Sequence, residues 1–391
     1  MESPPTFFNH ILAMPSPARG HINPMMNLCK LLISKNNNIL VTFIVTEEWL
    51  TFISSEPKPD NISFRSIPNV VPSELIRGRD HADFMERAWF FRVLNRVTIV
   101  GKRDTIFNLL ENGDERISYI PGISSTRLAD FPLKDDSSRS KRMMQMTMKG
   151  FQWIHKAQYL LFTSIYELES QAIDTLKSKL PLPIYTIGPT IPYFINLTNN
   201  PKPNTTNSYI EWLDSQPTGS VLYIAQGSFF SASSEQIDEI ANALCESNVR
   251  FLWVARGEAT RLKEICGHMG LILEWCNQLR VLSHSSIGGF WSHCGWNSTK
   301  DGVIYGVPLL TFPINLDQPF NSKMMLRVKE DVKGDILVKK CEIVKLVCVL
   351  RNDICTTILC CDAIGNGGSA DNDLNSFIGD ILMHCLRYTH A

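Results

Sequence analysis

The sequence lacks a strong charge of one sign and any long apolar run. Its 38 basic and 39 acidic residues give a net charge of −1, so the composition does not favour binding to nucleic acid or to an anionic membrane. No run of 18 apolar residues occurs, and we therefore expect no membrane-spanning helix. Residues 1–9 lack a basic patch followed by an apolar stretch, so we expect no secretory signal.

Paired-cysteine motifs are also missing. The 11 cysteines include no C-x-x-C pair, and their odd number without a secretory signal indicates reduced thiols and a cytoplasmic location. The candidates for zinc ligands are His284, His293 and Cys294, but their spacing fits no common zinc pattern. We therefore expect no metal and no cofactor.

What the sequence does contain is an alternation of apolar strands and helices. At 391 residues and 44% hydrophobic composition, the chain is long enough for two domains. Near the start we expect a strand at 9–14, a helix that opens at Pro24 and runs to about residue 34, and a β-branched strand at 39–46. This βαβ order predicts a parallel sheet covered by helices. Later strands are expected at 158–163, 183–188, 220–225, 250–255, 287–291 and 307–312, and later helices at 166–179, 234–247, 297–305 and 373–386.

A stretch rich in Pro, Asn and Thr separates the two expected domains. Residues 190–207 show no periodicity and are typical of a linker. We expect a first domain at 1–189 and a second at 208–370, with a final helix at 371–391 that packs back on the first domain. Nothing in the chain repeats.

The most informative segment is the turn between the expected strand 287–291 and the expected helix 297–305. A strand that passes through glycine into a helix directs backbone N–H groups and the positive end of the helix dipole at one point. His293, Asn297 and Ser298 add side-chain donors there. Such turns occur throughout α/β proteins, so on its own this one is weak evidence for phosphate binding.

Residues around this turn strengthen the interpretation. Trp275 offers a flat face for a base, and Gln278 and Asp301 can hydrogen-bond to ribose hydroxyls. Asp317 and Gln318 follow a further apolar strand and could bind sugar hydroxyls. Base, ribose, diphosphate and hexose would each have a partner within one segment.

A second strand that ends on glycine precedes this segment. The expected strand 220–225 runs into Gln226-Gly227-Ser228 before the helix 234–247. Ser228 is therefore a second possible contact for a diphosphate, provided that the two strand ends face each other.

Residues 275–318 resemble the nucleotide-sugar signature of plant UDP-dependent glycosyltransferases. That signature begins W-x-x-Q, continues H-C-G-W-N-S and closes on D-Q after 44 residues, and this chain matches at 275–278, 293–298 and 317–318. The family has Glu where this chain has Asp301, so the ribose contact would lengthen or pass through water. The resemblance implies these donor contacts: uracil on Trp275; ribose on Gln278 and Asp301; diphosphate on His293, Asn297 and Ser298; sugar on Trp296, Asp317 and Gln318.

The N-terminal stretch P-S-P-A-R-G-H at 15–21 is similar to the family's first signature, in which the histidine is the general base. By position alone His21 would be an ordinary surface or loop histidine, and the resemblance makes it the candidate base. The family pairs this histidine with an aspartate that follows a later strand. Between residues 80 and 120 no such strand is evident, and the chain lacks several tens of residues there. Either the missing piece carried the aspartate, or Asp104 replaces it.

The resemblance implies an α/β fold of two facing Rossmann-like domains, the GT-B arrangement, with a shortened first domain. It implies an inverting transfer of a hexose, expected to be glucose, from a UDP-sugar to a hydroxyl or carboxyl of a small phenolic, terpenoid or hormone-like acceptor. The alternative is a UDP-sugar-binding homologue that is catalytically impaired or inactive because it lost the segment with the aspartate. We expect a monomer that binds neither nucleic acid nor membrane.

Overall fold

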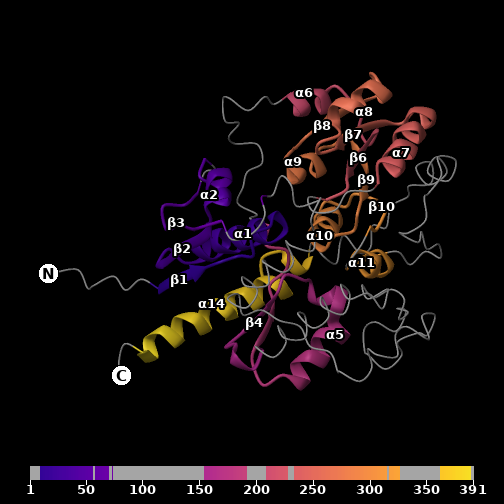
Figure 1. The fold of residues 1–391 in the computed structure, drawn as a ribbon. Coiled ribbons are helices and arrows are strands. Elements are labelled where there is room, and N and C mark those ends of the chain that lie inside the picture. The colour runs from indigo at the N-terminus through magenta and orange to yellow at the C-terminus, as the bar shows by residue number, and fades with distance from the viewer. Residues whose placement is uncertain are drawn as a thin grey trace, which may run out of the picture. The chain divides into compact units, whose positions relative to one another are not determined.

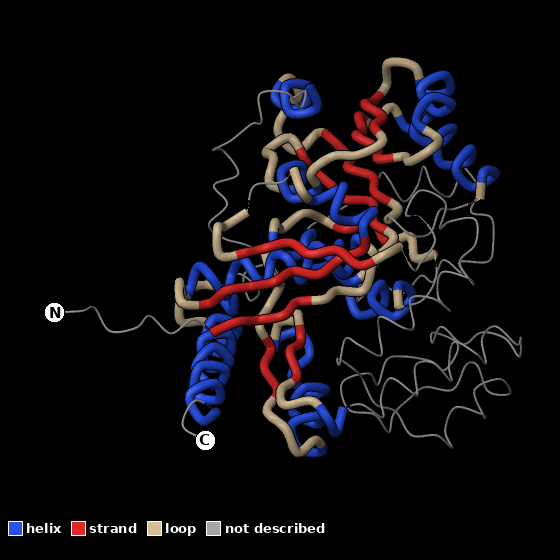
Figure 2. Tube along the Cα trace, turned by 60° about the vertical axis from the view of Figure 1, so that its left-hand side comes forward, coloured by secondary structure: helices blue, strands red, loops and turns tan. Residues whose placement is uncertain are grey.

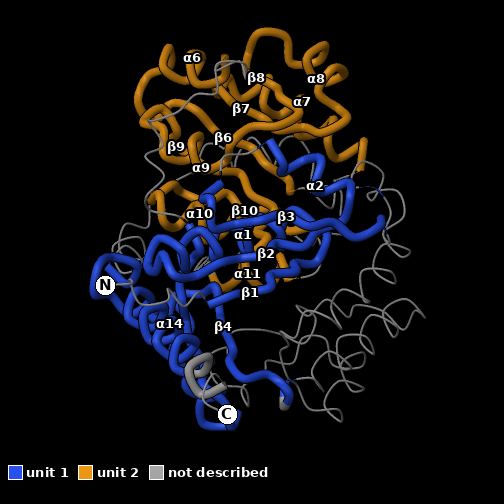
Figure 3. The backbone as a smooth tube through the Cα atoms, turned by 90° about the vertical axis from the view of Figure 1, so that its left-hand side faces the viewer, with its two compact units in different colours: residues 1–125, 133–194, 362–391 blue, residues 126–132, 195–361 orange. Residues whose placement is uncertain are grey.

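The computed structural model describes residues 9–55, 58–69, 73, 154–191, 208–227, 233–314, 317–325 and 362–388. The chain divides into two compact units (Figure 3). The first unit comprises residues 1–125, 133–194 and 362–391, and the second comprises residues 126–132 and 195–361.

The first unit contains a parallel sheet in the order β1-β2-β3. Its strands are β1 (Asn9–Ala13), β2 (Ile39–Thr46) and β3 (Ile62–Ile67), and the helices between them are α1 (Arg19–Lys35) and α2 (Glu47–Ile53) (Figure 1, indigo). Alternate residues of β2 are buried, beginning with Ile39, Val41 and Phe43. They form a core with buried residues of α1, as expected from a β-branched strand that presents one face to a helix.

The described part of the first unit also contains a second, two-stranded parallel sheet. It pairs β4 (Leu160–Phe162) with β5 (Ile184–Thr186), and it is accompanied by the short 3₁₀-helix η3 (Ile154–Lys156) and by α5 (Tyr166–Lys179).

The last helix, α14 (Ser369–Tyr388), packs in this same unit. Phe377 is buried and meets the ring of Tyr159 edge to face, with 5.7 Å between the ring centroids. The carboxylate of Asp373 accepts a 2.7 Å hydrogen bond from the backbone N–H of Thr186 at the end of β5. The C-terminal end of the sequence thus supplies part of the core around β1 and β2.

The start of α1 differs from the sequence-based expectation. We predicted that Pro24 opens the helix and that His21 precedes it, but α1 begins at Arg19 and contains Pro24. A proline lacks the N–H that an interior helical position uses, and near a helix start this omits only one backbone bond. The amides of His21 and Ile22 both donate to the carbonyl of Ala18, at 2.9 Å each, which begins the helix earlier.

The second unit is a five-stranded parallel sheet in the order β10-β9-β6-β7-β8 (strands red in Figure 2). Its strands are β6 (Val221–Ala225), β7 (Arg250–Val254), β8 (Gly270–Leu273), β9 (Ile287–Ser292) and β10 (Leu309–Thr311). Its helices are α6 (Ser208–Asp214), α7 (Ser234–Ser247), α8 (Ala259–Cys266), α9 (Gln278–Leu282), α10 (Trp296–Ile304) and α11 (Gln318–Met325).

The central strand β6 is buried along its whole length. Leu222 and Ile224 face a core shared with α7 and α8, while Val221 and Tyr223 face a separate core on the other side. A strand buried on both faces is typical of a doubly covered parallel sheet, and this gives the unit its Rossmann-like form.

Several predicted strands are shorter in the structure, among them 158–163, which reduces to Leu160–Phe162, and two of them lie next to a proline. The stretch 183–188 reduces to Ile184–Thr186, and 307–312 reduces to Leu309–Thr311. Each observed strand starts directly after a proline, Pro183 or Pro308, which has no N–H to give to a neighbouring strand. Within the parts of the chain that the structure describes, every helix falls short of the length and apolar character needed to cross a membrane.

Candidate functional site

Two adjacent strand ends form the centre of the candidate site. In the second unit β6 and β9 are hydrogen-bonded neighbours, and Ala225 lies opposite Ser292 where both strands end. The turn Gln226-Gly227 therefore lies beside the turn His293-Cys294-Gly295. The carboxyl ends of parallel strands are where α/β proteins bind ligands, so the two glycine turns singled out in the sequence do meet.

The imidazole of His293 lies between two glycines. A Cβ atom added to Gly227 would lie 2.6 Å from His293 Nε2, and one added to Gly295 would lie 2.5 Å from the same atom. Gly227 also has a φ of +86°, which side-chain-bearing residues rarely adopt. Neither position can carry a side chain without displacing the ring, so the glycines fix where His293 sits.

The surroundings of His293 keep its ring neutral. Burial lowers the pKa of His293, and the backbone carbonyl of Ala225 and the charge of Asp317 oppose that shift only in part. Its Nδ1 atom is buried and makes no hydrogen bond in good geometry among the residues that the structure describes. A neutral imidazole still presents one N–H donor, which can hydrogen-bond to an oxygen of a bound anion.

Helix α10 begins at this same turn. Its N-cap is Gly295, which has no side chain to cap the helix, and Trp296, Asn297 and Ser298 form the first turn. The backbone N–H groups of a first turn point along the helix axis and carry the positive end of its dipole. The predicted diphosphate ligands Asn297 and Ser298 are thus placed beside a ready anion-binding helix end.

Cys294 sets the geometry of the turn between β9 and α10. It is one of two non-glycine residues with positive φ among those described, at +62°. Its N–H donates to Ser292 Oγ at 3.0 Å, and its carbonyl accepts from Asn321 Nδ2 at 2.9 Å. Burial raises the pKa of the Cys294 thiol to about 12, so this cysteine stays protonated and is no nucleophile.

Asn321 was not identified from the sequence. It is buried on α11, and its Nδ2 also donates to Asp317 Oδ2 at 2.7 Å, so one amide connects the β9–α10 turn with Asp317. The signal available in the sequence was its position four residues after Asp317, which places both on one face of a helix start.

The predicted ribose ligands form one hydrogen-bonded group. Gln278 Nε2 donates to Asp301 Oδ2 at 2.8 Å and to Ser298 Oγ at 3.3 Å. The hydroxyl of Tyr223, buried in β6, donates to Gln278 Oε1 at 3.4 Å. Burial raises the pKa of Asp301 to about 6, against the lowering effects of Gln278 and Lys300. Although Asp301 is one methylene shorter than the Glu of the family signature, its carboxylate thus still reaches Gln278.

The predicted base and sugar ligands flank this group. Trp275, between β8 and α9, is 52% exposed, which leaves much of the indole accessible to a stacking partner. Asp317 is exposed, whereas Gln318 is 4% exposed and its Oε1 accepts from the Ile314 N–H at 2.8 Å. Trp296 lies on α10, with Lys300 Nζ 5.9 Å from its ring centroid.

The predicted catalytic residues belong to the first unit. His21 is an exposed residue in the first turn of α1. Asp104 lies outside the described residues, and so does the second-unit residue Ser228. The structure therefore places His21 but neither of these two.

The three residues considered for zinc do not gather into one site. His284 Nε2 lies 3.0 Å from Asp214 Oδ1, and His284 Nδ1 lies 2.9 Å from Ser286 Oγ, at the amino end of β9 rather than its carboxyl end. No group of three or more His, Cys, Asp or Glu side chains suited to a metal occurs within the described ranges.

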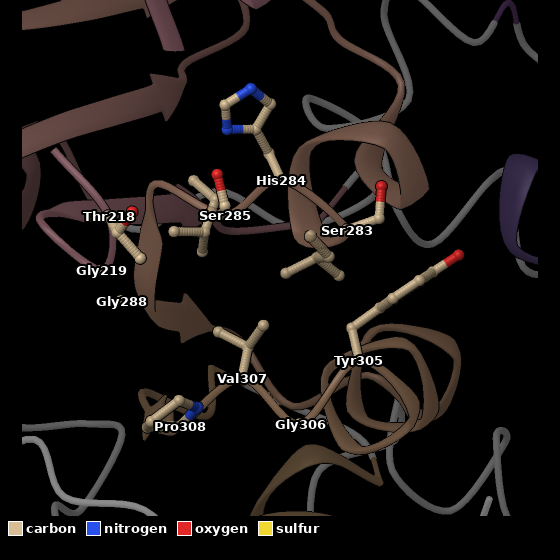
Figure 4. A pocket seen from close by; sticks show the side chains of 12 residues that line it. Thr218, Gly219, Ser283, His284, Ser285, Gly288, Tyr305, Gly306, Val307 and Pro308 are labelled. Atoms are coloured by element: carbon tan, nitrogen blue, oxygen red, sulfur yellow. The ribbon is translucent and has the colours of Figure 1, made fainter. Parts of the chain in front are cut away.

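A separate depression lies at the amino ends of β9 and β10 (Figure 4). It has a volume of about 470 Å³, and Figure 4 shows residues 283–285 on one side and residues 305–308 on the other. It contains none of the predicted donor ligands, because those lie at the opposite ends of the strands.

Comparisons with known proteins point to one family. Residues 142–343 match the family model described as UDP-glucoronosyl and UDP-glucosyl transferase. UDP-glycosyltransferase 87A2 of Arabidopsis thaliana is 42% identical over 88% of this chain and 88% of its own length. UDP-glycosyltransferase 87A1 of the same plant is 39% identical over 94% of this chain and 99% of its own.

The alignments with both relatives are longer than this chain. They extend over 406 and 440 positions, against 391 residues in total here. The alignments must therefore contain positions at which the relatives have residues and this chain has none. This agrees with a chain that is shortened internally.

Solved structures share the architecture. The structure of Phytolacca americana UGT2 complexed with UDP-2fluoro-glucose and pterostilbene covers 97% of this chain and 100% of its own, with a TM-score of 0.75 at 24% identity. At that identity the likeness shows the fold, which is the predicted α/β GT-B class with Rossmann-like units.

Proposed function

The chain belongs to the family of UDP-glucoronosyl and UDP-glucosyl transferases and is a glycosyltransferase; from that premise we propose that it transfers a hexose, glucose by expectation, from a UDP-sugar to a small plant metabolite. The observation that carries the donor half of the proposal is the ring of His293 held between Gly227 and Gly295 at the start of α10. An anion bound there meets an imidazole, backbone N–H groups and the positive end of a helix dipole.

In the proposed donor complex each part of UDP-sugar has its own contact. Uracil stacks on the accessible indole of Trp275. The ribose hydroxyls form hydrogen bonds with Gln278 and Asp301, which in the present structure are hydrogen-bonded to each other. The proposed diphosphate contacts are His293, Asn297, Ser298 and Ser228, and the proposed sugar contacts are Trp296, Asp317 and Gln318.

The sugar contacts differ in what they can offer. Asp317 Oδ2 is oriented by Asn321, and this exposed carboxylate can accept hydrogen bonds from sugar hydroxyls. The Oε1 of Gln318 already accepts from the Ile314 backbone, which holds its amide in one orientation. We expect Asp317 to contribute more to sugar binding than the buried Gln318 oxygen does.

The proposed reaction is a direct displacement at the anomeric carbon. His21 takes the proton of the acceptor hydroxyl, the acceptor oxygen bonds to the anomeric carbon, and the bond to the β-phosphate oxygen breaks, which inverts α to β. Negative charge develops on the departing UDP, and the α10 N-terminus and His293 stabilise it without needing a metal. Asp104 is proposed to stabilise protonated His21.

The function is tested with purified protein, UDP-glucose and a panel of phenolic and terpenoid alcohols. We expect a product heavier by one hexose in mass spectrometry, together with free UDP. Donor choice is tested by replacing UDP-glucose with UDP-galactose or UDP-xylose.

Donor binding is tested separately by fluorescence quenching with UDP. Trp275→Leu should remove most of the quenching and raise the Kd for UDP about tenfold, because stacking a base on an aromatic ring is worth roughly 1–3 kcal/mol. Trp212→Phe on α6 is the matched control and should leave the Kd unchanged. Equal affinity in the Trp275→Leu protein would contradict the uracil assignment.

A second candidate function is UDP-sugar binding without turnover. It is favoured by the alignments that exceed the length of this chain, since an internally shortened first unit could lack the aspartate that pairs with His21. Saturable UDP binding by folded protein, with no hexose transfer to any acceptor in the panel, would support it over the enzyme. The proposed monomeric state and cytoplasmic location are tested by analytical ultracentrifugation and by imaging of a tagged chain.

A further inference from the structure

Two cysteines outside the donor site contact each other across a helix pair. Cys245 is half-buried near the end of α7, and Cys266 is 3% exposed at the end of α8. Cys245 Sγ is 3.9 Å from the carbonyl oxygen of Ile265, the residue before Cys266, and the Cys245 thiol raises the pKa of Cys266, so the two side chains are neighbours. Both are reduced in the structure. They are therefore a contacting pair rather than two isolated thiols.

The framework around the pair holds the two helices in place. Arg261 on α8 forms ion pairs with Asp238 on α7 and, at 2.7 Å, with Glu258. Asp238 and Cys245 lie seven residues, two helical turns, apart and share the face of α7 that meets α8. Cys266 lies in the core cluster between the helices, and Cys245 packs against it from the side. Both thiols thus lie at the contact between α7 and α8, which the ion pair of Arg261 with Asp238 bridges.

We propose that Cys245 and Cys266 form a redox site that exchanges thiols with glutathione disulfide and closes to a disulfide between α7 and α8. The half-buried Cys245 reacts first because its sulfur is the accessible one, and the buried Cys266 resolves the intermediate. The site is independent of the donor site, which lies at the opposite ends of the strands.

The steps balance as two thiol–disulfide exchanges. The Cys245 thiolate attacks one sulfur of glutathione disulfide, so a mixed disulfide forms and one glutathione leaves. The Cys266 thiolate then attacks Cys245 Sγ, forms the protein disulfide and expels the second glutathione. Two protein thiols are oxidised, one glutathione disulfide is reduced, and the two protons end on the two glutathione thiols.

Burial controls the second step. Burial, with a smaller contribution from Cys245, raises the pKa of Cys266 to about 12, so only a small fraction is thiolate at neutral pH. Below that pKa the thiolate fraction rises about tenfold for each pH unit. Closure should therefore accelerate about tenfold from pH 7 to pH 8, while the pair stays reduced in a glutathione pool that is itself reduced.

The decisive experiment is peptide mapping of the native protein after incubation with glutathione disulfide. Cleavage after glutamate yields peptides 240–246 and 265–274, which carry one cysteine each and separate Cys266 from Cys276. We expect these two peptides to be joined, with the mass loss of two hydrogens and no bound glutathione. Dithiothreitol should release them.

Variants and stability distinguish the order of events. In Cys266→Ser the mixed disulfide on Cys245 should persist, whereas Cys245→Ser should take up no glutathione at this pair. Cys276→Ser, a buried cysteine without a cysteine neighbour among the described residues, is the control and should still form the link. The disulfide closes the loop between Cys245 and Cys266, which should raise the Tm of the oxidised wild type by about 5 °C over the reduced protein.

Several results would overturn the proposal. One is a wild-type protein in which Cys245 keeps glutathione and the peptides stay separate. Another is a link that forms only in denaturant. Loss of UDP binding on oxidation would contradict the separation of this site from the donor site, whereas failure of the proposed hexose transfer would not affect the disulfide measurement.

Discussion

The two units arrange their parallel strands differently. The second unit joins β6 to β10 into one five-stranded sheet, and every described donor residue follows one of its strands. In the first unit the described strands fall into a three-stranded and a two-stranded sheet, and β1 has a neighbour on one side only among them. Leu12 of β1 is 67% exposed, unusual for a parallel strand. The described residues proposed to bind the donor therefore lie in the unit with one continuous sheet, while the proposed base His21 lies in the more divided unit.

The largest expected effect separates the two units by function. His21→Ala should lower kcat by about 10²–10⁴-fold, because the acceptor proton loses its base. The Kd for UDP should not change, since all described residues proposed to contact the donor lie in the second unit. Steady-state rates and UDP titration measure the two quantities.

His10→Ala is the matched control for this change. It removes another exposed histidine of the first unit, one whose Nε2 lies 2.8 Å from Thr42 Oγ1 on the sheet. It should leave kcat near the wild-type value. A His21→Ala protein with full turnover would show that the base assignment is wrong.

A smaller effect is expected from the glycines that fix His293. Gly227→Ala should weaken UDP binding about 30-fold, since the new Cβ displaces His293 and a hydrogen bond to a charged group is worth roughly 1.5–3 kcal/mol. Gly257→Ala is the control, because Gly257 also has positive φ, at +71°, but has open space around it. Gly257→Ala should lower the free energy of unfolding without changing the Kd for UDP. Equal UDP affinity in both variants would contradict a role for the clamped ring.

The pH dependence of Asp301 should have a smaller effect still. Its folded-state pKa of about 6 exceeds the ordinary value of 3.8, so the folded protein holds this proton more tightly than the unfolded chain does. Its contribution to stability is therefore greatest below pH 4 and declines as the pH rises through 6. Asp301→Asn removes this pH-dependent loss of stability. The Tm of the variant relative to that of the wild type should therefore increase as the pH is raised from 5 to 7.5.

The same carboxyl should affect UDP binding. Above pH 6 the carboxylate accepts hydrogen bonds from ribose, so wild-type affinity should fall a few-fold on acidification to pH 5. Asp301→Asn should bind UDP weakly and with little pH dependence. Asp60→Asn, at an exposed site of the first unit, is the control. A wild-type Kd that is flat between pH 5 and 7.5 would count against the ribose contact.

The smallest effect is expected at the surface of the first unit. Lys35 Nζ on α1 lies 2.5 Å from Asp371 Oδ1 on α14, and both side chains are partly accessible. Lys35→Ala should lower the free energy of unfolding by less than about 1 kcal/mol, as is usual for such pairs, with no change in UDP affinity.

Phe377→Ala is the contrasting change to the same helix. It should lower the free energy of unfolding by about 3–5 kcal/mol, because α14 is held mainly by its buried face. Chemical denaturation of the Lys35→Ala and Phe377→Ala variants measures both losses and shows whether α14 is held by its apolar face or by the ion pair.

Much of the fold follows from periodicity. The strand Ile39–Thr46 and the helices Tyr166–Lys179 and Ser234–Ser247 have the limits predicted from their apolar patterns. Each has a strong local signal, either β-branched alternation or a repeated apolar face. The predicted start of α1 was wrong because proline is tolerated inside the first turns of a helix as well as at its first position, so Pro24 does not mark where the helix begins.

The site was predictable in part. The turns at Gly227 and Gly295 could be located, but their closeness to His293 depends on β6 pairing with β9, which is a tertiary contact. Asn321 was missed for the same reason, since it reaches Cys294 only when α11 packs against the turn. The partner of His21 stays a prediction, because Asp104 lies outside the described residues.

Cys294 has a further consequence for the donor turn. A side-chain-bearing residue in the left-handed region costs roughly 1–2 kcal/mol, which glycine would avoid. Glycine at position 294 would also give the backbone more conformational freedom, and the N–H groups that follow it would no longer be held in one orientation. The strained turn, held by hydrogen bonds to Ser292 and Asn321, thus lowers the free energy of unfolding and in return stays rigid at the proposed nucleotide site.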